Sequence, residues 1–169
     1  IDLIKAMKLL DDESKKDVVL KLYGTIDIKN PAHIKEEELK SQLIRGFIKW
    51  EGFTSEVKRI LESADIYCLP SYREGLPKSS IEAMAIGRPI ITTNAPGCED
   101  TVQDGYNGYK IEAGDVEALS KKLNELIKNK QLRIQMGENS RKLFLRNFTL
   151  EKVISQIVES YNSVLSITC

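Results

Sequence analysis

Two glutamates, Glu74 and Glu82, flank a Gly-Leu-Pro turn in the segment PSYREGLPKSSIEAMAIGRP, residues 70–89. The turn runs directly into an apolar segment with helical spacing, and Pro77 suits the first helical position because its missing N–H is not needed there. The amides of residues 78–80 are then free, and they lie at the positive end of the helix dipole. A turn of this kind is a ready site for a phosphate group.

Charged side chains around the turn extend this predicted phosphate site. Lys78 and Arg73 add positive charge beside the amides. Glu82 lies about one turn into the helix, and helical side chains lean toward the amino end, so its carboxylate can reach a hydroxyl group beside the phosphate. A ribose suits it, as in dinucleotide sites, where an acidic residue binds the ribose. Glu74 would lie on the other side of the phosphate, where a second polyol has room.

A purely structural interpretation also fits these residues. Ser79 and Glu82 have the spacing of a capping box, with Ser79 at the N-cap and Glu82 at the third helical position. From spacing alone the two interpretations have about equal weight. For Glu74 the structural alternative is a solvated loop carboxylate beside Arg73.

The elements around the turn alternate between strand and helix. We expect strands at residues 18–24, 47–53, 65–71, 89–93 and 109–113, and helices at 2–11, 34–44, 54–64, 78–86, 115–129, 131–146 and 149–166. Thr54 or Ser55 would cap the helix at 54–64. Such alternation predicts an α/β fold, a three-layer Rossmann-like parallel sheet with helices on both faces. Ligands bind at the carboxyl ends of such strands, which is where the Glu74 turn lies.

The composition fits one domain, because 169 residues with 41% apolar side chains can bury one good core. Twenty-five basic residues balance twenty-five acidic ones, so no overall charge attracts nucleic acid or an anionic membrane. The cysteines Cys68, Cys98 and Cys169 lack the spacing of a disulfide framework or a zinc site, which favours a reducing cytoplasm. We expect a soluble chain without a spanning helix. Ile1 already lies in a helical pattern, so we also expect a piece of a longer protein.

Several motifs together resemble a known family. They are the E-x7-E pair Glu74 and Glu82, the following EAMAIGRPII, the PGC loop, DGYNGY, and the downstream LRIQMGENSR and FTLEKV. The chain resembles, over nearly its whole length, the carboxyl-terminal domain of a family 4 glycosyltransferase with the two-domain GT-B fold. The GTIDIKNPAHI and SYREGLPKS segments are similar to the branch that builds bacterial surface polysaccharides and lipid-linked oligosaccharides.

The resemblance implies a retaining, metal-independent transfer of a hexosyl group to a glycan or lipid-linked acceptor in polysaccharide biosynthesis. The donor would be a UDP- or GDP-sugar, with no further cofactor, and the sequence contains no Asp-x-Asp metal motif. Glu74 would be the catalytic residue, contacting the donor sugar near the reacting centre as an electrostatic and positioning group. Gly75, Leu76 and Pro77 would line the sugar and the pyrophosphate.

The same resemblance assigns the nucleotide end of the donor. Lys78 and Ser79 would offer backbone amides to the phosphates, and Glu82 would hold the ribose hydroxyls. Gly52 and Phe53, in the turn after the strand at 47–53, would lie against the base. These roles agree with the helix geometry, which makes the capping box the weaker interpretation of Glu82.

Parts of the family pattern lie outside this chain or differ in it. The family usually has a basic residue and a strand with Lys-Gly just upstream of residue 1. Its amino-terminal domain, which binds the acceptor, is also absent from residues 1–169, so we expect this carboxyl-terminal donor-binding domain alone to bind donor weakly and transfer nothing. The longer protein would be cytoplasmic, with peripheral contact to the inner membrane face. Glu99 and Asp100 stand where the family has a basic residue and then glutamate.

Other functions remain as alternatives. A dinucleotide oxidoreductase would show G-x-G-x-x-G after its first strand, and this sequence has none. A sugar-nucleotide epimerase of the GT-B fold would bind a similar ligand, but the E-x7-E pattern disfavours it. A non-catalytic nucleotide-sugar-binding or interaction domain stays open.

The remaining aromatic and titratable side chains have simpler structural roles. His33 lies in a polar loop and is expected at the surface, and Trp50 is expected to pack. Tyr72 would be either an anchor for its loop or a platform for a sugar, with the anchor favoured. The last helix places an apolar stripe on one face, formed by Val153, Ile157, Val158, Tyr161 and Leu165.

Overall fold

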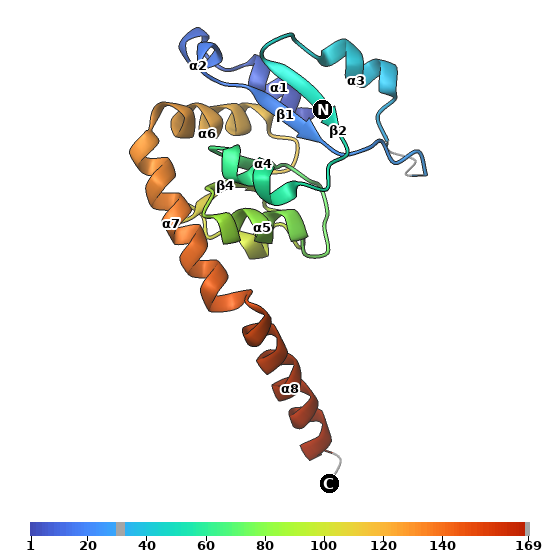
Figure 1. Cartoon of the computed structure of the whole chain (residues 1–169), viewed down its shortest axis with the longest axis vertical. Helices are drawn as coiled ribbons and strands as arrows, with labels where there is room; N and C mark the ends of the chain where they lie inside the picture. Colours follow the sequence, from blue (N-terminus) through green and yellow to red (C-terminus); the bar gives the residue numbers. More distant parts are fainter. Residues whose placement is uncertain (30–32, 168–169) are drawn as a thin grey trace.

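The structure is a computed structural model that describes residues 1–29 and 33–167 (Figure 1). Its elements follow in the order α1 (Asp2–Lys8), α2 (Asp12–Lys16), β1 (Leu20–Tyr23), α3 (Glu36–Gln42), β2 (Ile48–Gly52), α4 (Val57–Ser63), β3 (Tyr67–Leu69), α5 (Lys78–Ile86), β4 (Ile90–Thr93), the 3₁₀ helix η1 (Glu99–Thr101), β5 (Gly108–Ile111), α6 (Val116–Lys128), α7 (Lys130–Asn147) and α8 (Leu150–Ile167). The alternation of strands and helices agrees with the sequence pattern. In the part of the chain that is described, no helix is both long and apolar enough to cross a membrane.

The strand pairs are parallel, and the described strands form two hydrogen-bonded groups. β1 pairs with β2, with Leu20 opposite Ile48, and β4 lies between β3 and β5. One hydrophobic core joins the two groups, because Ile48 of β2 belongs to the same cluster as Ile91 of β4 and Tyr109 of β5. The predicted α/β fold with parallel strands is therefore confirmed, although its strands do not form one continuous ladder of hydrogen bonds.

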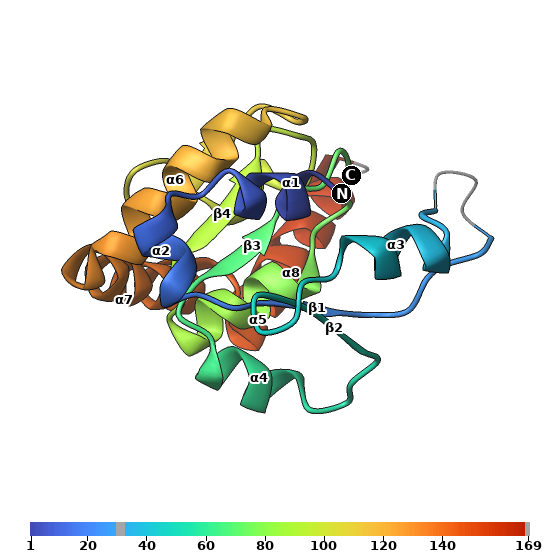
Figure 2. The same ribbon diagram turned by 90° about the horizontal axis from the view of Figure 1, so that it is seen from above.

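Helices cover both faces of the strand layer. Ile90 and Ile91 are adjacent on β4, both are fully buried, and they point to opposite faces because side chains alternate along a strand. Ile91 shares a core cluster with Met7 of α1 and Leu123 of α6. Ile90 belongs to a second cluster, with Met84 of α5. Figure 2 shows the same arrangement, with α1 and α6 on one side of β3 and β4 and with α4 and α5 on the other. This is the expected three-layer architecture.

The first helix is shorter than predicted, and a second helix follows it. α1 ends at Lys8, and α2 begins at Asp12. Asp11 is the N-cap of α2, since its Oδ1 accepts a hydrogen bond from the Ser14 amide at 2.9 Å. An aspartate in this position satisfies an amide that would otherwise lack an acceptor and restarts the helix.

The cap predicted for the helix after β2 is also wrong. α4 begins at Val57, and its N-cap residue is Glu56, so neither Thr54 nor Ser55 caps the helix. Thr54 Oγ1 instead accepts a hydrogen bond from the Glu56 amide at 2.9 Å. A threonine hydroxyl can close a turn over its own backbone in this way, and here that turn precedes the helix.

α8 extends away from the body of the molecule after α7 (Figure 1). It carries a row of exposed apolar side chains, which confirms the predicted stripe and adds further members to it: Leu150, Val153, Ile154, Ile157, Val158, Tyr161, Val164 and Leu165. Such a wide apolar face is unusual on a free helix and is normally covered by another surface.

Candidate functional site at the carboxyl edge of β3 and β4

The Glu74 turn follows β3 and leads into α5, as the sequence predicts. The capping box, however, does not form. Pro77 is the N-cap of α5, with φ −70° and ψ 108°, and no side chain caps the helix. Ser79 lies inside the first helical turn, where its Oγ accepts a hydrogen bond from the Tyr67 hydroxyl at 2.7 Å. The structural interpretation of Ser79 and Glu82 is therefore wrong, and Pro77 stands one position before the helix rather than at its first residue.

Two amides remain available at the amino end of α5. The Ser80 and Ile81 amides both donate to the Pro77 carbonyl, at 3.0 and 3.2 Å, so the prediction of a free Ser80 amide is wrong. The amides of Lys78 and Ser79 have no acceptor among the described residues. Free amides at the start of a nine-residue helix point a partial positive charge toward solvent.

The two glutamates differ in exposure. Glu82 is exposed one turn into α5, whereas Glu74 is half-buried in the turn before it. Beneath them lies Tyr67 of β3, whose pKa is raised mainly by burial and further by the charge of Glu74. The Tyr67 phenol is therefore a neutral donor that holds Ser79, a role that no motif in the sequence indicates.

Two threonines of β4 hold the backbone that leads to Glu74. Thr92 Oγ1 donates to the Leu69 carbonyl at 2.9 Å, and Thr93 Oγ1 donates to the Ser71 carbonyl. Both threonines are fully buried. A buried hydroxyl with a buried partner fixes a backbone more firmly than a solvated one, so these side chains position the turn from the neighbouring strand. The β-branched IITT pattern indicated the strand but not this second function.

The turn is also tied to the beginning of the chain. The Tyr72 hydroxyl donates to Asp2 Oδ2 at 2.7 Å, which raises the Tyr72 pKa through its hydrogen bond to the carboxylate. The interpretation of Tyr72 as a loop anchor is therefore supported by a direct contact.

The predicted base-contacting turn belongs to the other group of strands. Gly52 ends β2 with a φ of +72°, and its carbonyl accepts a hydrogen bond from the Gly24 amide at 2.8 Å. Phe53 follows with 77% of its surface exposed. Both residues thus stand at the carboxyl end of a parallel strand, but the strand does not pair with the one that carries Glu74. Their contact with a base stays a prediction.

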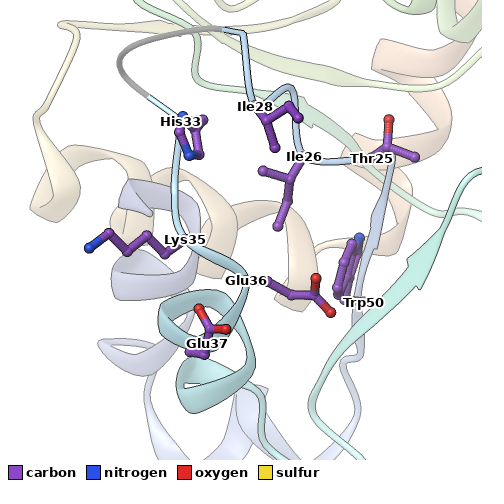
Figure 3. Close-up of a pocket in the computed structure, with 8 residues that line it drawn as sticks. All are labelled: Thr25, Ile26, Ile28, His33, Lys35, Glu36, Glu37 and Trp50. Carbon is purple, nitrogen blue, oxygen red and sulfur yellow. The ribbon is translucent and has the colours of Figure 1, made fainter.

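A hollow of about 440 Å³ lies beside the β1–β2 pair, between the loop after β1 and the start of α3 (Figure 3). Ile26 and Trp50 supply apolar walls, and Glu36 points toward Trp50 from α3. The Trp50 Nε1–H donates to the Gly24 carbonyl at 2.9 Å, and Glu36 pairs with Lys40 at 2.7 Å. None of the predicted site residues lines this hollow, and two of its polar side chains, Trp50 and Glu36, already bind other groups of the protein, so we place the candidate site at the Glu74 turn.

The remaining predictions concern single residues. Cys68 and Cys98 are free thiols, and burial raises the pKa of Cys68 to about 12, so this thiol is inert at neutral pH. Cys169 lies outside the described residues. Within the described ranges, no group of histidine, cysteine and acidic side chains is arranged to hold a metal ion. Glu99 and Asp100 are exposed in η1.

Comparison with known proteins decides the family. The family model of the glycosyl transferases group 1 matches residues 1–143. The chain belongs to this family. An uncharacterized glycosyltransferase of Haemophilus influenzae is 36% identical over 145 residues, covering 82% of this chain and 41% of the relative. The N,N'-diacetylbacillosaminyl-diphospho-undecaprenol alpha-1,3-N-acetylgalactosaminyltransferase of Campylobacter jejuni is 32% identical over 111 residues, covering 66% of this chain and 28% of the relative.

Solved structures of glycosyltransferases share the fold. The Anabaena protein HepE, in complex with UDP, superposes with a TM-score of 0.83 at 23% identity, covering 96% of this chain and 44% of that chain. The predicted resemblance to one half of a GT-B glycosyltransferase is thereby confirmed at the level of fold and family. The group 1 chain described here spans less than half the length of these relatives, and its placement in family 4 stays a prediction.

Proposed function

We propose that this domain binds the nucleotide-diphosphate sugar of a retaining, metal-independent glycosyltransferase, which transfers a hexosyl group to a glycan or lipid-linked acceptor. The observation that carries the proposal is the pair Glu74 and Glu82, held on either side of two free amides at the carboxyl end of β3. Membership of the glycosyl transferases group 1 supports it. The acceptor type follows relatives such as the Campylobacter jejuni enzyme, whose name includes a diphospho-undecaprenol acceptor.

Each part of the site has one task in this proposal. The amides of Lys78 and Ser79 bind the phosphates, and Glu82 accepts hydrogen bonds from the ribose hydroxyls. The turn of Gly75 to Pro77 lines the sugar and the pyrophosphate. Glu74 lies beside the anomeric centre, where positive charge develops on the sugar as the nucleoside diphosphate leaves. A carboxylate fixed at that point stabilises the transition state more than the ground state.

Nucleotide titration of the full-length protein tests the donor site. We expect one of UDP, GDP and ADP to bind selectively, and Glu82→Ala to weaken it roughly 10- to 100-fold, since charge-assisted hydrogen bonds contribute about 1.5–3 kcal/mol. Glu62→Ala is the matched control, because Glu62 is also an exposed helical glutamate but lies near the end of α4, which leads into the amino end of β3 at the opposite edge. Equal affinities for the wild type and both variants would remove Glu82 from the site.

Product analysis separates transfer from binding alone. Incubation of the full-length protein with the bound donor and a polyprenyl-diphosphate-linked sugar should give an elongated glycan whose new linkage keeps the anomeric configuration of the donor. Selective binding without transfer would favour the non-catalytic alternative. A donor sugar that returns with altered stereochemistry would favour the epimerase.

A further inference from the structure

The loops after β3 and β4 touch each other at the Glu74 turn. The Glu74 amide donates a hydrogen bond to the Pro96 carbonyl at 3.1 Å, so the backbone of the second loop supports the backbone of the first. The residue after Pro96 is Gly97. A Cβ atom on Gly97 would overlap the carbonyl oxygens of both Glu74 and Gly75 and would lie 2.7 Å from the Glu74 carbonyl carbon. The neighbours are backbone atoms, which cannot rotate aside.

Buried contacts fix the start of the turn that carries Glu74, so the turn cannot move as a whole. Ser71, three residues earlier, is held by Thr93 Oγ1 and lies 4.0 Å from the Sγ of Cys98. Thr93 and Cys98 are both fully buried. A side chain at position 97 would therefore push the Glu74 backbone outward, toward solvent, while the start of its turn stays fixed.

We propose that Gly97 is a positioning residue for Glu74: its missing side chain allows the loop after β4 to hold the Glu74 carboxylate at the donor sugar. This inference rests on the proposed function. A displacement of about 1 Å in a group that acts on the transition state can reduce turnover about 10²-fold. Glu82 and the two free amides belong to α5, beyond the Glu74–Gly75 backbone that Gly97 approaches, so nucleotide binding should change much less than turnover.

Gly97→Ala is compared with Gly46→Ala in the full-length protein. The two glycines have nearly the same left-handed backbone, with φ of +79° and +82°, so alanine is strained at both. A Cβ on Gly46 would meet nothing within 4 Å, and Gly46 lies in the loop before β2, away from the site. The control therefore carries the backbone strain without the displacement of Glu74.

Three readouts test the inference. Hydrogen–deuterium exchange of the peptide that contains Glu74 should rise in Gly97→Ala and stay unchanged in Gly46→Ala. Release of UDP or GDP from UDP-glucose, UDP-N-acetylglucosamine and GDP-mannose should fall about 10²-fold in Gly97→Ala only. The affinity for UDP or GDP itself should change less than about threefold, which corresponds to a change in binding free energy of less than about 1 kcal/mol.

A double variant with Glu74→Gln shows whether Gly97 acts through Glu74. Once Glu74→Gln has removed the carboxylate, Gly97→Ala should cause little further loss of turnover. Additive losses, or unchanged exchange in Gly97→Ala, would overturn the positioning role. If Glu74→Gln alone keeps full turnover, the role of Glu74 in the proposed function fails. This outcome can be told apart from a failure of the Gly97 inference, because hydrogen–deuterium exchange reports on the contact between Gly97 and Glu74 without depending on turnover.

Discussion

The carboxyl edges of the two strand groups are built differently. After β3 and β4, buried hydroxyls and a close backbone approach hold the loops together, through Thr92, Thr93 and Gly97. After β1 and β2, the Gly24 backbone links the two loops: its amide donates to the Gly52 carbonyl, and its carbonyl accepts a hydrogen bond from the exposed Trp50 Nε1–H. A hollow of about 440 Å³ lies beside that second edge.

The loops after β3 and β4 are therefore the more firmly fixed of the two edges. Fixing a loop costs conformational entropy, about 1–2 kcal/mol for each backbone residue, and buried contacts must compensate for it. The chain makes those contacts around the turn that carries Glu74. The proposed chemistry requires a fixed carboxylate there, whereas the predicted contact of the Gly52–Phe53 turn with a base would tolerate a looser loop.

The largest expected effect concerns the core beneath the two edges. Ile91 is fully buried on β4, so Ile91→Ala should lower the free energy of unfolding by about 2–5 kcal/mol. Leu22→Ala on β1, where the side chain is only half-buried, should cost clearly less. Denaturant unfolding of both variants measures this, and equal losses would show that the two strand groups are equally well packed.

A smaller effect is expected from a single hydroxyl at the supported edge. Thr93→Val keeps the shape but removes the donor to the Ser71 carbonyl, which should cost about 1–3 kcal/mol because the acceptor is partly buried. Thr54→Val removes an exposed hydrogen bond after β2 and should cost less than about 1 kcal/mol. Thermal unfolding compares them, and a reversed order would contradict the difference between the edges.

The indole hydrogen bond sets the strength of the β1–β2 edge. Trp50→Phe removes the donor to the Gly24 carbonyl and keeps an aromatic wall, so we expect a loss of about 0.5–1.5 kcal/mol. Nucleotide affinity should stay unchanged, since Trp50 lines the hollow and not the Glu74 turn. A marked loss of nucleotide binding would instead show that the ligand depends on this edge, either in the hollow or at the Gly52–Phe53 turn, which Gly24 links to Trp50.

The smallest effect is a pH dependence at the β1–β2 side, where α2 meets α6. The hydrogen bond from Lys128, at 2.7 Å, and then the Ser14 amide lower the pKa of Asp11 from 3.8 to about 2. A lowered carboxyl pKa stabilises the fold above pH 3.8, and this contribution is lost as the pH falls toward 2.

Asp11→Asn tests this pH dependence because asparagine still caps α2 but cannot form the ion pair. The melting temperature of the variant should be slightly below that of the wild type at pH 6, and the difference should vanish near pH 2. Added salt should also shrink the difference at pH 6, because the pair is at the surface. A difference that does not change with pH would assign the effect to the cap alone.

Much of the fold could be predicted because its signals are local. Gly87 takes a left-handed conformation with φ 75° and ends α5 at Ile86, which is also the last residue of the helix predicted at 78–86. The period of apolar residues predicted parallel strands with covering helices. The local pattern gave a wrong prediction at Ser79. Its hydroxyl can either cap a helix or bind a side chain of another element, and it accepts a hydrogen bond from Tyr67 of β3.

The amino-acid sequence is enough to predict the α/β alternation, the family and the position of Glu74 and Glu82 around one turn, since each depends on residues close together in the chain. Three features became known from the folded structure: Tyr67 donates to the Ser79 hydroxyl, Pro77 is the N-cap of α5, and Gly97 packs on the Glu74 backbone. These contacts join residues from different strands and loops. Their partners are set by the packing of the sheet, which no local spacing encodes.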